Sequence, residues 1–366
     1  MSRTTDDSLH MRRALRLAER GRGRTAPNPI VGAVVVKDAR VVGEGWHRAL
    51  GEPHAEAVAL ARAGALAKGA TLYCTLEPCA HFGRTSPCCD SIIASGIRRC
   101  VVAMRDPHRV VDGRGLAVLR AAGVRVDVGL LEAEARAMLP GYVLAHTEQR
   151  PRVTWKVAAT LDGRIADAKG SSRWITGAKA RERGHVMRGA SDAILIGAGT
   201  ARADDPRLTV RLARGATRQP LRVVCDSQLT LPTSLRLFGR TLARGTVVAC
   251  VSTAPTRRVA ALEARGVRVW RLPSAKARVS PRALAKRLAR EGVLEVLLEG
   301  GATLGASWLK ASLLDRIALF TAPKVLGAGL SWCAPFGALL ASAPQGRVSS
   351  IERAGDDTLT WIELED

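Results

Sequence analysis

One histidine and two cysteines in the first quarter of the chain have the types and spacing of zinc ligands. His54 stands two residues before Glu56, and Cys79 and Cys88 follow with eight residues between them. Three protein ligands leave the fourth position of a tetrahedral Zn²⁺ open to water, as catalytic zinc requires. Glu56 is expected to move protons beside the metal without binding it. This order of residues is typical of zinc deaminases, in which zinc-bound hydroxide attacks an amidine-like ring carbon and ammonia leaves.

The elements around these residues are those of a layered α/β fold. A helix is predicted over residues 54–63, with His54 on its first turn, and a buried strand over 71–77. Pro78 suits the first position of another helix, which would place Cys79 at a helix N-terminus that favours the thiolate. Alternating strands and helices predict a sheet with helices on both faces. Further helices are predicted over 8–20, 88–95 and 115–122, and strands over 30–36, 41–44, 98–104 and 124–128.

The chain of 366 residues is long enough for two ordinary domains. The pattern resets at the polar stretch 147–151, which is typical of a linker, and no repeat relates the two halves. The second half alternates again, so two different α/β domains are predicted. Its expected strands are 152–160, 192–196, 221–226, 246–251 and 293–298, and its expected helices are 178–187, 257–264, 281–290 and 304–311.

Composition indicates a globular protein of the cytoplasm. Apolar residues make up 47% and aromatic residues 4% of the chain, and no apolar run approaches the length of a transmembrane helix. The first seven residues are polar, so no signal peptide is expected. Most cysteines other than the two metal candidates lie in apolar runs, as reduced core thiols do.

The net charge of +23 raises the question of a nucleic-acid partner. The excess is mostly arginine scattered along the chain, without a block of five or six like charges and with almost no interleaved aromatic residues. An arginine-rich background and anionic small substrates are the competing explanations.

Two glycine-rich turns and several charged residues are the candidates for chemistry in the second half. The turns 197–200 and 299–305 follow apolar strands, where backbone NH groups could hold a phosphate; tight turns without a ligand are the alternative. Lys156 lies in an apolar strand, where a charge needs a reason. Arg188 and Arg211 are candidate anchors for an anionic substrate, with ordinary surface ion pairs as the alternative. No Gly-x-Gly-x-x-Gly opens a βαβ unit, so a Rossmann site is not supported.

These motifs together resemble one family over essentially the whole chain, the bifunctional deaminase–reductases of riboflavin biosynthesis. The eight residues between Cys79 and Cys88 are similar to the riboflavin enzymes, whereas nucleoside and tRNA deaminases of the superfamily usually have two residues there. The matching stretches are 26–32 (APNPIVG), 54–56 (HAE), 75–88 (TLEPCAHFGRTSPC), 156–163, 172–177, 203–211 and 299–304 (EGGATL).

The resemblance implies a three-layer cytidine-deaminase-like domain over residues 1–147 and a dihydrofolate-reductase-like α/β domain over 151–366. The first would use Zn²⁺ to hydrolyse the 2-amino group of 2,5-diamino-6-ribosylamino-4(3H)-pyrimidinone 5′-phosphate. The second would use NADPH to reduce the ribosyl chain to ribityl. The implied partner is a small phosphorylated pyrimidine, without nucleic acid or membrane, and a homo-oligomer is expected because family members are commonly oligomeric.

Matching positions carry the family's functional residues onto this chain. The zinc ligands would be His54, Cys79 and Cys88, with Glu56 as the catalytic proton shuttle. The pyrimidine would contact Asn28, His47, Arg84 and Asp106, although a plain turn residue is an equal interpretation of Asn28 between its two prolines. In the reductase half, the substrate site would be lined by Lys156, Ser172, Arg188, Asp204, Leu208, Arg211 and Glu299. NADPH would be held by Ala158, Trp174, Thr200, Ser227 and Gly301.

The chain departs from the family pattern at three places in its first half. His108 stands where asparagine is usual, Val111-Asp112 replace a small pair, and residues 139–142 are atypical. Cys89 offers a competing thiolate next to the second cysteine ligand.

Two other functions remain open at this point. One is a nucleic-acid (tRNA) base deaminase with an accessory domain, which the charge favours and the cysteine spacing opposes. The other is a basic binding protein with structural zinc, which the set of only three ligands opposes.

Overall fold

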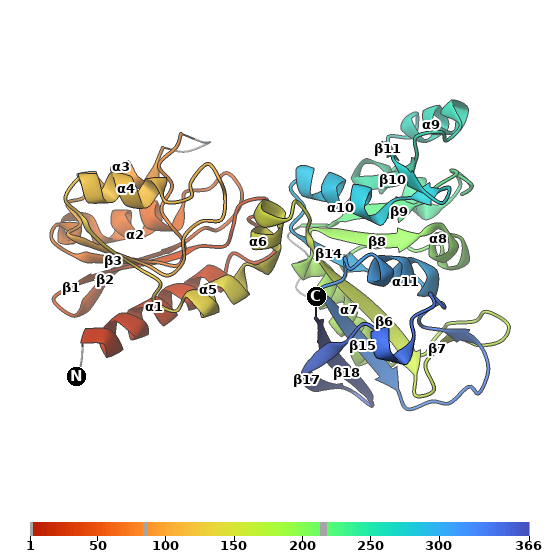
Figure 1. Ribbon diagram of the computed structural model, residues 1–366. Coiled ribbons are helices and arrows are strands. Elements are labelled where there is room, and N and C mark those ends of the chain that lie inside the picture. The colour runs from red at the N-terminus through yellow and green to blue at the C-terminus, as the bar shows by residue number, and fades with distance from the viewer. Residues whose placement is uncertain (1–2, 83–85, 213–217, 366) are drawn as a thin grey trace. The chain divides into compact units, whose positions relative to one another are not determined.

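The computed structural model describes residues 3–82, 86–212 and 218–365 (Figure 1). The chain divides into two compact units, Met1–Gln149 and Arg150–Asp366, and each has its own core. Within the described residues there is no helix with the length and apolar character needed to cross a membrane.

The first unit is built on a five-stranded sheet with the order β2-β1-β3-β4-β5. β1 runs antiparallel to both of its neighbours, whereas β3, β4 and β5 are parallel. The parallel strands therefore end at one edge of the sheet, where the loops that follow them can share a site. The strands are β1 (Gly32–Lys37), β2 (Arg40–Trp46), β3 (Thr71–Cys74), β4 (Arg99–Val102) and β5 (Arg125–Val128).

Helices cover both faces of this sheet, which makes the three layers that the sequence predicts (Figure 1). α2, α3 and α4 share one apolar core with β1, β3 and β4, and α1 packs on the opposite face. Gly45 lets α2 approach closely, because a Cβ there would lie 2.1 Å from the Ala55 carbonyl oxygen. The helices are α1 (Arg3–Glu19), α2 (Ala55–Ala63), α3 (Cys88–Ala94), α4 (Arg114–Ala121), α5 (Glu132–Met138) and α6 (Pro140–Thr147). The sequence analysis did not predict α5 and α6.

The second unit is built on a nine-stranded sheet with the order β11-β10-β9-β8-β14-β6-β15-β18-β17. Its strands from β11 to β15 are parallel, and β18 and β17 form an antiparallel hairpin at one edge. The strands are β6 (Arg152–Thr160), β8 (Ala193–Gly197), β9 (Leu221–Cys225), β10 (Thr246–Val251), β11 (Arg268–Leu272), β14 (Glu295–Leu298), β15 (Arg316–Ala322), β17 (Gly346–Ala354) and β18 (Asp357–Leu364). The short strands β7 (Arg164–Ala166), β12 (Ser274–Ala275), β13 (Arg278–Val279) and β16 (Leu330–Ser331) pair outside this sheet.

Alternating side chains of the central strands serve two cores. In β14, Val296 and Leu298 belong to the main core, while Leu297 faces a smaller core with α7. The main core takes in the helices of this unit other than α7. The helices are α7 (Ala178–Ala190), α8 (Ala198–Asp204), α9 (Thr256–Glu263), α10 (Pro281–Arg290) and α11 (Ala302–Lys310).

Candidate active sites

The three predicted zinc ligands meet at one point of the first unit. His54 is the N-cap of α2, Cys79 lies in the loop after β3, and Cys88 is the first residue of α3. Nδ1 of His54 lies 3.2 Å from Sγ of Cys88 and 3.7 Å from Sγ of Cys79, and the three ligand atoms all lie within 4.8 Å of one another. One imidazole nitrogen and two sulfurs are ligands that suit Zn²⁺, so these donors fit the metal.

Cys79 does not begin a helix, and this part of the sequence analysis was wrong. The Cys79 carbonyl accepts the backbone N–H of Cys89, which holds the loop against α3 instead of turning it into a helix. The N-terminus of α3 contacts the sulfur directly, because the backbone N–H of Cys88 donates to Sγ of Cys79 at 3.4 Å. Hydrogen bonds from the Cys88 thiol and from His54 lower the pKa of Cys79, which favours the thiolate.

Glu56 is 4% exposed and lies in the first turn of α2. Burial raises the pKa of its carboxyl, which favours the uptake of a proton.

The competing thiol of Cys89 points away from the ligand atoms. Its Sγ donates to the carbonyl oxygens of Pro78 at 3.5 Å and Gly115 at 3.6 Å, and burial raises its pKa to about 12. Cys88 is therefore the cysteine of this pair that can bind the metal.

Asn28 and His47 form a hydrogen-bonded chain beside the zinc ligands. His47 Nδ1 lies 3.2 Å from the Pro53 carbonyl oxygen, which can only accept, so this nitrogen carries the proton. His47 Nε2 then accepts from Nδ2 of Asn28 at 3.2 Å, and its ring lies 5.3 Å from that of His54. Among the described residues the amide oxygen of Asn28 has no hydrogen-bond partner, so it can accept from a ligand.

Asp106 is buried in the loop after β4 and is held by two donors. The backbone N–H of His108 donates to its Oδ1 at 2.8 Å, and the Tyr142 hydroxyl donates to the same oxygen at 3.0 Å. Burial raises the pKa of Asp106 to about 6. Arg84, predicted for the same pyrimidine site, lies outside the described residues.

The sequence analysis gave Glu77 no role, but the structure shows that it organises this loop. Its buried carboxylate accepts four backbone N–H groups, at 3.0 to 3.3 Å, from residues that lie 29 to 39 positions later in the chain. The donors are Asp106, Gly113, Gly115 and Leu116. The sequence offered one signal for this function, the position of Glu77 directly before the Pro-Cys pair. The donors themselves could not be recognised, because they are distant in sequence.

In the second unit, the two glycine-rich turns lie side by side at the ends of neighbouring parallel strands. β8 ends at Gly197, the N-cap of α8, and β14 leads to Gly301, the N-cap of α11. The backbone N–H of Gly301 donates to Oγ1 of Thr200 at 3.1 Å. From this point β8 connects to β9 on one side and β14 connects to β15 on the other. Such a reversal leaves a crevice in which α/β proteins bind ligands.

Two further residues predicted to hold NADPH belong to strands that neighbour β8 and β14 or to the segments that follow them. Ser227 follows β9, the neighbour of β8, and its hydroxyl accepts the backbone N–H of Val279 at 3.0 Å. Ala158 lies in β6, the neighbour of β14, and is partly buried.

A buried cluster of charges lies at the end of β14. Arg188 of α7 donates from Nε to Oε1 of Glu299 and from Nη2 to Oε2, each at 2.6 Å. Its guanidinium is thus paired within the protein, which differs from the free phosphate anchor considered from the sequence. Lys156 lies close to both residues. The pKa of its amine is lowered, chiefly by burial; the charge of Glu299 opposes this change and the charge of Arg188 adds to it.

Arg211 remains a candidate anion anchor beside this pair. Its backbone N–H donates to Nδ1 of His185 at 3.3 Å, and its Nη2 lies 3.3 Å from Nε2 of the same ring. A neutral imidazole has one acceptor nitrogen, so it cannot satisfy both donors. The sequence analysis did not single out His185, because its position on α7 is evident only in three dimensions.

The other predicted reductase residues lie in the segments before α7 and after β8. Leu208 is buried next to Thr209, whose carbonyl accepts from Arg188 at 3.2 Å. Asp204 ends α8, and burial raises the pKa of its carboxyl. Ser172 is partly buried in the loop before α7, and Trp174, in the same loop, is 64% exposed.

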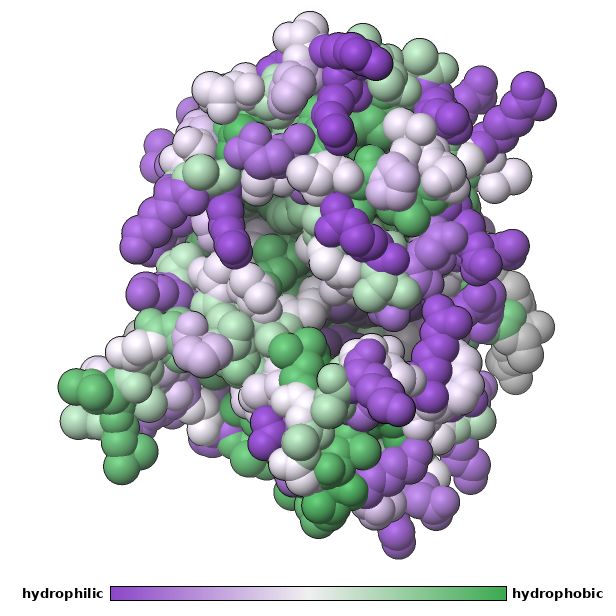
Figure 2. Space-filling model, turned by 90° about the vertical axis from the view of Figure 1, so that its right-hand side faces the viewer, coloured by the Kyte–Doolittle hydropathy of each residue, from purple (hydrophilic) through white to green (hydrophobic). Residues whose placement is uncertain are grey.

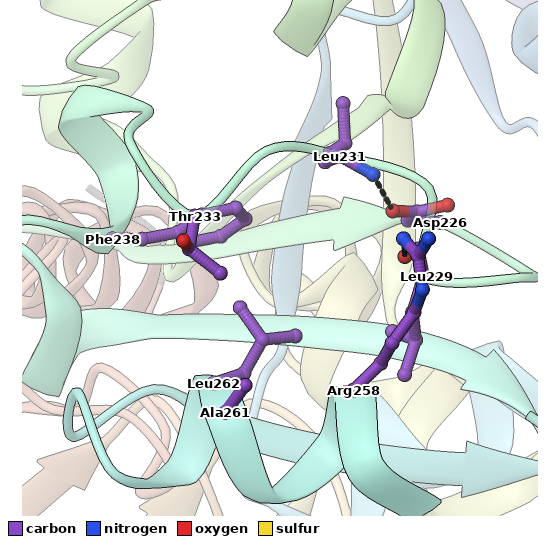
Figure 3. A pocket seen from close by; sticks show the side chains of 8 residues that line it. All are labelled: Asp226, Leu229, Leu231, Thr233, Phe238, Arg258, Ala261 and Leu262. Carbon is purple, nitrogen blue, oxygen red and sulfur yellow. Dashed lines mark hydrogen bonds between the residues drawn. The ribbon is translucent and has the colours of Figure 1, made fainter. Parts of the chain in front are cut away.

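A separate small cavity lies between the segment after β9 and the helix α9 (Figure 3). Its charged groups are bonded to the chain itself: Asp226 accepts the Leu231 N–H at 2.8 Å, and Arg258 donates to the Leu229 carbonyl. Nothing in this cavity requires a ligand. The lining residues are Asp226, Leu229, Leu231, Thr233, Phe238, Arg258, Ala261 and Leu262.

The face shown in Figure 2 carries hydrophilic side chains spread among apolar ones, without a single hydrophilic stripe.

Comparison with known proteins decides the family. Residues 4–104 match the family described as cytidine and deoxycytidylate deaminase zinc-binding region, and residues 151–360 match the RibD C-terminal domain. The chain belongs to the RibD family. The riboflavin biosynthesis protein RibD of Aquifex aeolicus is 43% identical over 325 residues, which cover 89% of each chain. RibD of Escherichia coli is 40% identical over 367 aligned residues, covering 96% of this chain and 97% of the relative.

Solved RibD structures share the fold over the whole chain. Acinetobacter baumannii RibD is 33% identical, with a TM-score of 0.91 and full coverage of both chains. A deaminase/reductase from Thermotoga maritima is 35% identical, with a TM-score of 0.86, and covers 99% of this chain and 100% of its own. The predicted fold class is confirmed: a cytidine-deaminase-like domain precedes a dihydrofolate-reductase-like RibD domain.

Proposed function

We propose that this RibD-family chain carries out two consecutive steps of riboflavin biosynthesis. The first is hydrolytic deamination of 2,5-diamino-6-ribosylamino-4(3H)-pyrimidinone 5′-phosphate. The second is NADPH-dependent reduction of the ribosyl group to ribityl. The observation that carries the proposal is the meeting of His54, Cys79 and Cys88 beside a buried Glu56, in a chain whose second unit is the RibD reductase domain.

The deaminase site assigns a function to each residue around the metal position. His54, Cys79 and Cys88 would hold Zn²⁺, which when bound lowers the pKa of its water towards neutrality. Glu56, whose pKa is raised by burial, takes a proton on the attack side and returns it to the leaving amine. The free oxygen of Asn28 and the Asp106 carboxylate offer acceptors to the amino and ring N–H groups of the pyrimidine.

The reductase site would hold the nucleotide along the strand ends and the sugar beside the charge cluster. NADPH, when bound at Ala158, Trp174, Thr200, Ser227 and the Gly301 turn, supplies the hydride. Lys156 and Asp204 are the candidates for polarising the sugar oxygen. Arg211 and the paired Arg188 favour a phosphorylated ligand, and Ser172, Leu208 and Glu299 complete the lining.

A coupled assay tests the proposal. Zinc-replete protein is given the diaminopyrimidinone ribosyl phosphate and NADPH, and ammonia release is followed together with absorbance at about 340 nm. Ammonia release followed by NADPH consumption is expected. The variant Glu56→Gln should keep zinc and lose deamination by about 100-fold or more. Ammonia release without NADPH consumption would limit the proposal to the first unit, and the absence of both would refute it.

A further inference from the structure

The last helix of the first unit, α6, reaches the Asp106 loop with two aromatic side chains. The Tyr142 hydroxyl lies 3.0 Å from Oδ1 and 3.3 Å from Oδ2 of Asp106. One turn later, the His146 ring packs edge-on against Tyr142 with centroids 4.4 Å apart, and against His108 with centroids 4.3 Å apart. These contacts join two of the places where the chain departs from its family pattern, His108 and the segment 139–142.

The two oxygens of the Asp106 carboxylate are held unequally. Its Oδ1 accepts both the His108 N–H and the shorter Tyr142 bond, whereas its Oδ2 has only the longer Tyr142 contact among the residues that the structure describes. The residue is 5% exposed, so the remaining lone pairs are not freely hydrated. Oδ2 is therefore the atom that can accept from a ligand.

We propose that Tyr142 is a positioning residue of the deaminase site, which holds the Asp106 carboxylate so that Oδ2 is presented to an N–H group of the pyrimidine. The inference rests on the proposed function, in which Asp106 contacts the substrate. His146 supports it by fixing the Tyr142 ring from the same helix. A diaminopyrimidinone carries several N–H donors, and an ionised carboxylate is an acceptor only, so the two are complementary.

The Tyr142 hydroxyl acts on both the orientation and the charge of Asp106. The terminal torsion of an aspartate side chain is broad, so a single backbone donor leaves the carboxylate free to rotate. Burial raises the pKa of Asp106, the charges of Glu77 and Cys79 raise it further, and the His108 N–H and the Tyr142 hydroxyl oppose this rise. Without the Tyr142 hydroxyl, Asp106 would be protonated more often. Its carboxyl O–H would then face an N–H donor of the pyrimidine instead of accepting from it.

Tyr142→Phe removes only the hydroxyl and keeps the ring against His146. The matched control is Thr147→Val, which removes a hydroxyl from the same helix that bonds only the Val143 carbonyl, at 2.9 Å. Both variants are made in the full chain, with and without Asp106→Asn. Deamination kinetics, zinc content and the pKa of Asp106, from carbon NMR of labelled aspartate in the zinc-loaded protein, are measured for each.

We expect Tyr142→Phe to raise the KM for deamination by about tenfold to a hundredfold, with zinc content unchanged. The pKa of Asp106 should rise, and the acid limb of kcat/KM should move to higher pH with it. In the Asp106→Asn background the same substitution should change KM less than about twofold. Thr147→Val should match the wild type.

A wild-type KM together with a wild-type Asp106 pKa in Tyr142→Phe would overturn the positioning role. An equal loss with and without Asp106→Asn would also overturn it, because Tyr142 would then act by another route. Failure of the wild type to deaminate would instead refute the proposed function, and the Asp106 pKa would still decide whether Tyr142 controls that carboxylate.

Discussion

Arg188 and Glu299 form a bidentate ion pair, with two N–H···O bonds of 2.6 Å, beneath the carboxyl ends of the central strands of the second unit. A planar guanidinium and a carboxylate matched in this way orient one another strongly. The pair therefore holds two opposite charges in fixed positions near Lys156. The Nζ atom of Lys156 also lies 5.5 Å from the centre of the Phe320 ring.

Replacing Glu299 with glutamine should destabilise the second unit. It leaves the Arg188 guanidinium buried beside Lys156 without its counter-ion, which typically costs about 3–5 kcal/mol. Urea unfolding of the second unit measures the change. The control is Arg183→Gln on the same helix, where the partner Glu352 is 2.9 Å away but both side chains are more than 40% exposed. The free energy of unfolding of this control should fall by less than about 1 kcal/mol. Equal losses in both variants would contradict the claim that burial makes the Arg188–Glu299 pair more important for stability than an exposed pair.

Replacing Glu77 with glutamine should loosen the loop between β4 and α4. The amide has one acceptor atom where the carboxylate has two, and its NH₂ would face backbone N–H donors. We expect a loss of about 2–4 kcal/mol in the free energy of unfolding of the first unit. Faster hydrogen exchange at Gly115 and Leu116 should accompany it.

The control for Glu77 is Glu19→Gln. Glu19 belongs to an exposed i, i+3 pair with Arg22 at the end of α1, and its loss should cost less than about 1 kcal/mol. Unchanged exchange at Gly115 in the Glu77 variant would show that the four backbone bonds do not hold this loop.

The two adjacent cysteines should differ in their importance for zinc. Cys88→Ser should lower the zinc content well below one ion per chain, because Sγ of Cys88 lies 3.2 Å from the ligand nitrogen of His54. Cys89→Ser should keep zinc, since its sulfur bonds carbonyl oxygens on the other side of α3. Metal analysis after dialysis decides the matter, and full zinc in Cys88→Ser would contradict the ligand assignment.

Acid should destabilise the first unit through His146. Burial and the charge of His108 hold the pKa of His146 at about 4, below about 6.5 for an unfolded histidine. The unfolded chain therefore takes up the proton first, and the stabilisation that is complete above pH 6.5 is lost as the pH falls towards 4. Because the ring is only partly buried, we expect roughly 1–2 kcal/mol from this source.

His146→Phe should reduce this pH dependence, since it keeps the ring contact but binds no proton. Unfolding measured at several pH values between about 4.5 and 7.5 tests it, with Thr147→Val as the control that keeps the wild-type slope. A wild-type slope in His146→Phe would assign the dependence to other groups.

The zinc site could be predicted from sequence because its information is local. His54, Glu56, Cys79 and Cys88 lie within 35 positions, and their types and order restrict the chemistry before any fold is known. The conformation of Cys79 could not be predicted in the same way. A proline before it favours a helix start, but the carbonyl that a helix needs is taken by the backbone of α3.

Other features depend on contacts between distant residues. Glu77 accepts bonds from residues up to 39 positions later, and Tyr142 reaches an aspartate 36 positions earlier, so no local pattern marks either side chain. Strands β15, β17 and β18 were not predicted; β17 is an edge strand with mostly exposed residues, which gives it no buried alternation to recognise. Strands β6 and β10 were predicted with their bounds, because both are rich in apolar residues and largely buried.

Removal of zinc tests most directly the claim that the chain deaminates first and reduces second. Protein from which a chelator has removed the zinc is given NADPH with either the diaminopyrimidinone ribosyl phosphate or its deaminated counterpart. The account predicts no ammonia release and no NADPH consumption with the first compound, undiminished NADPH consumption with the second, and recovery of both activities when zinc is returned. NADPH consumption by the zinc-free protein with the diamino compound would contradict it.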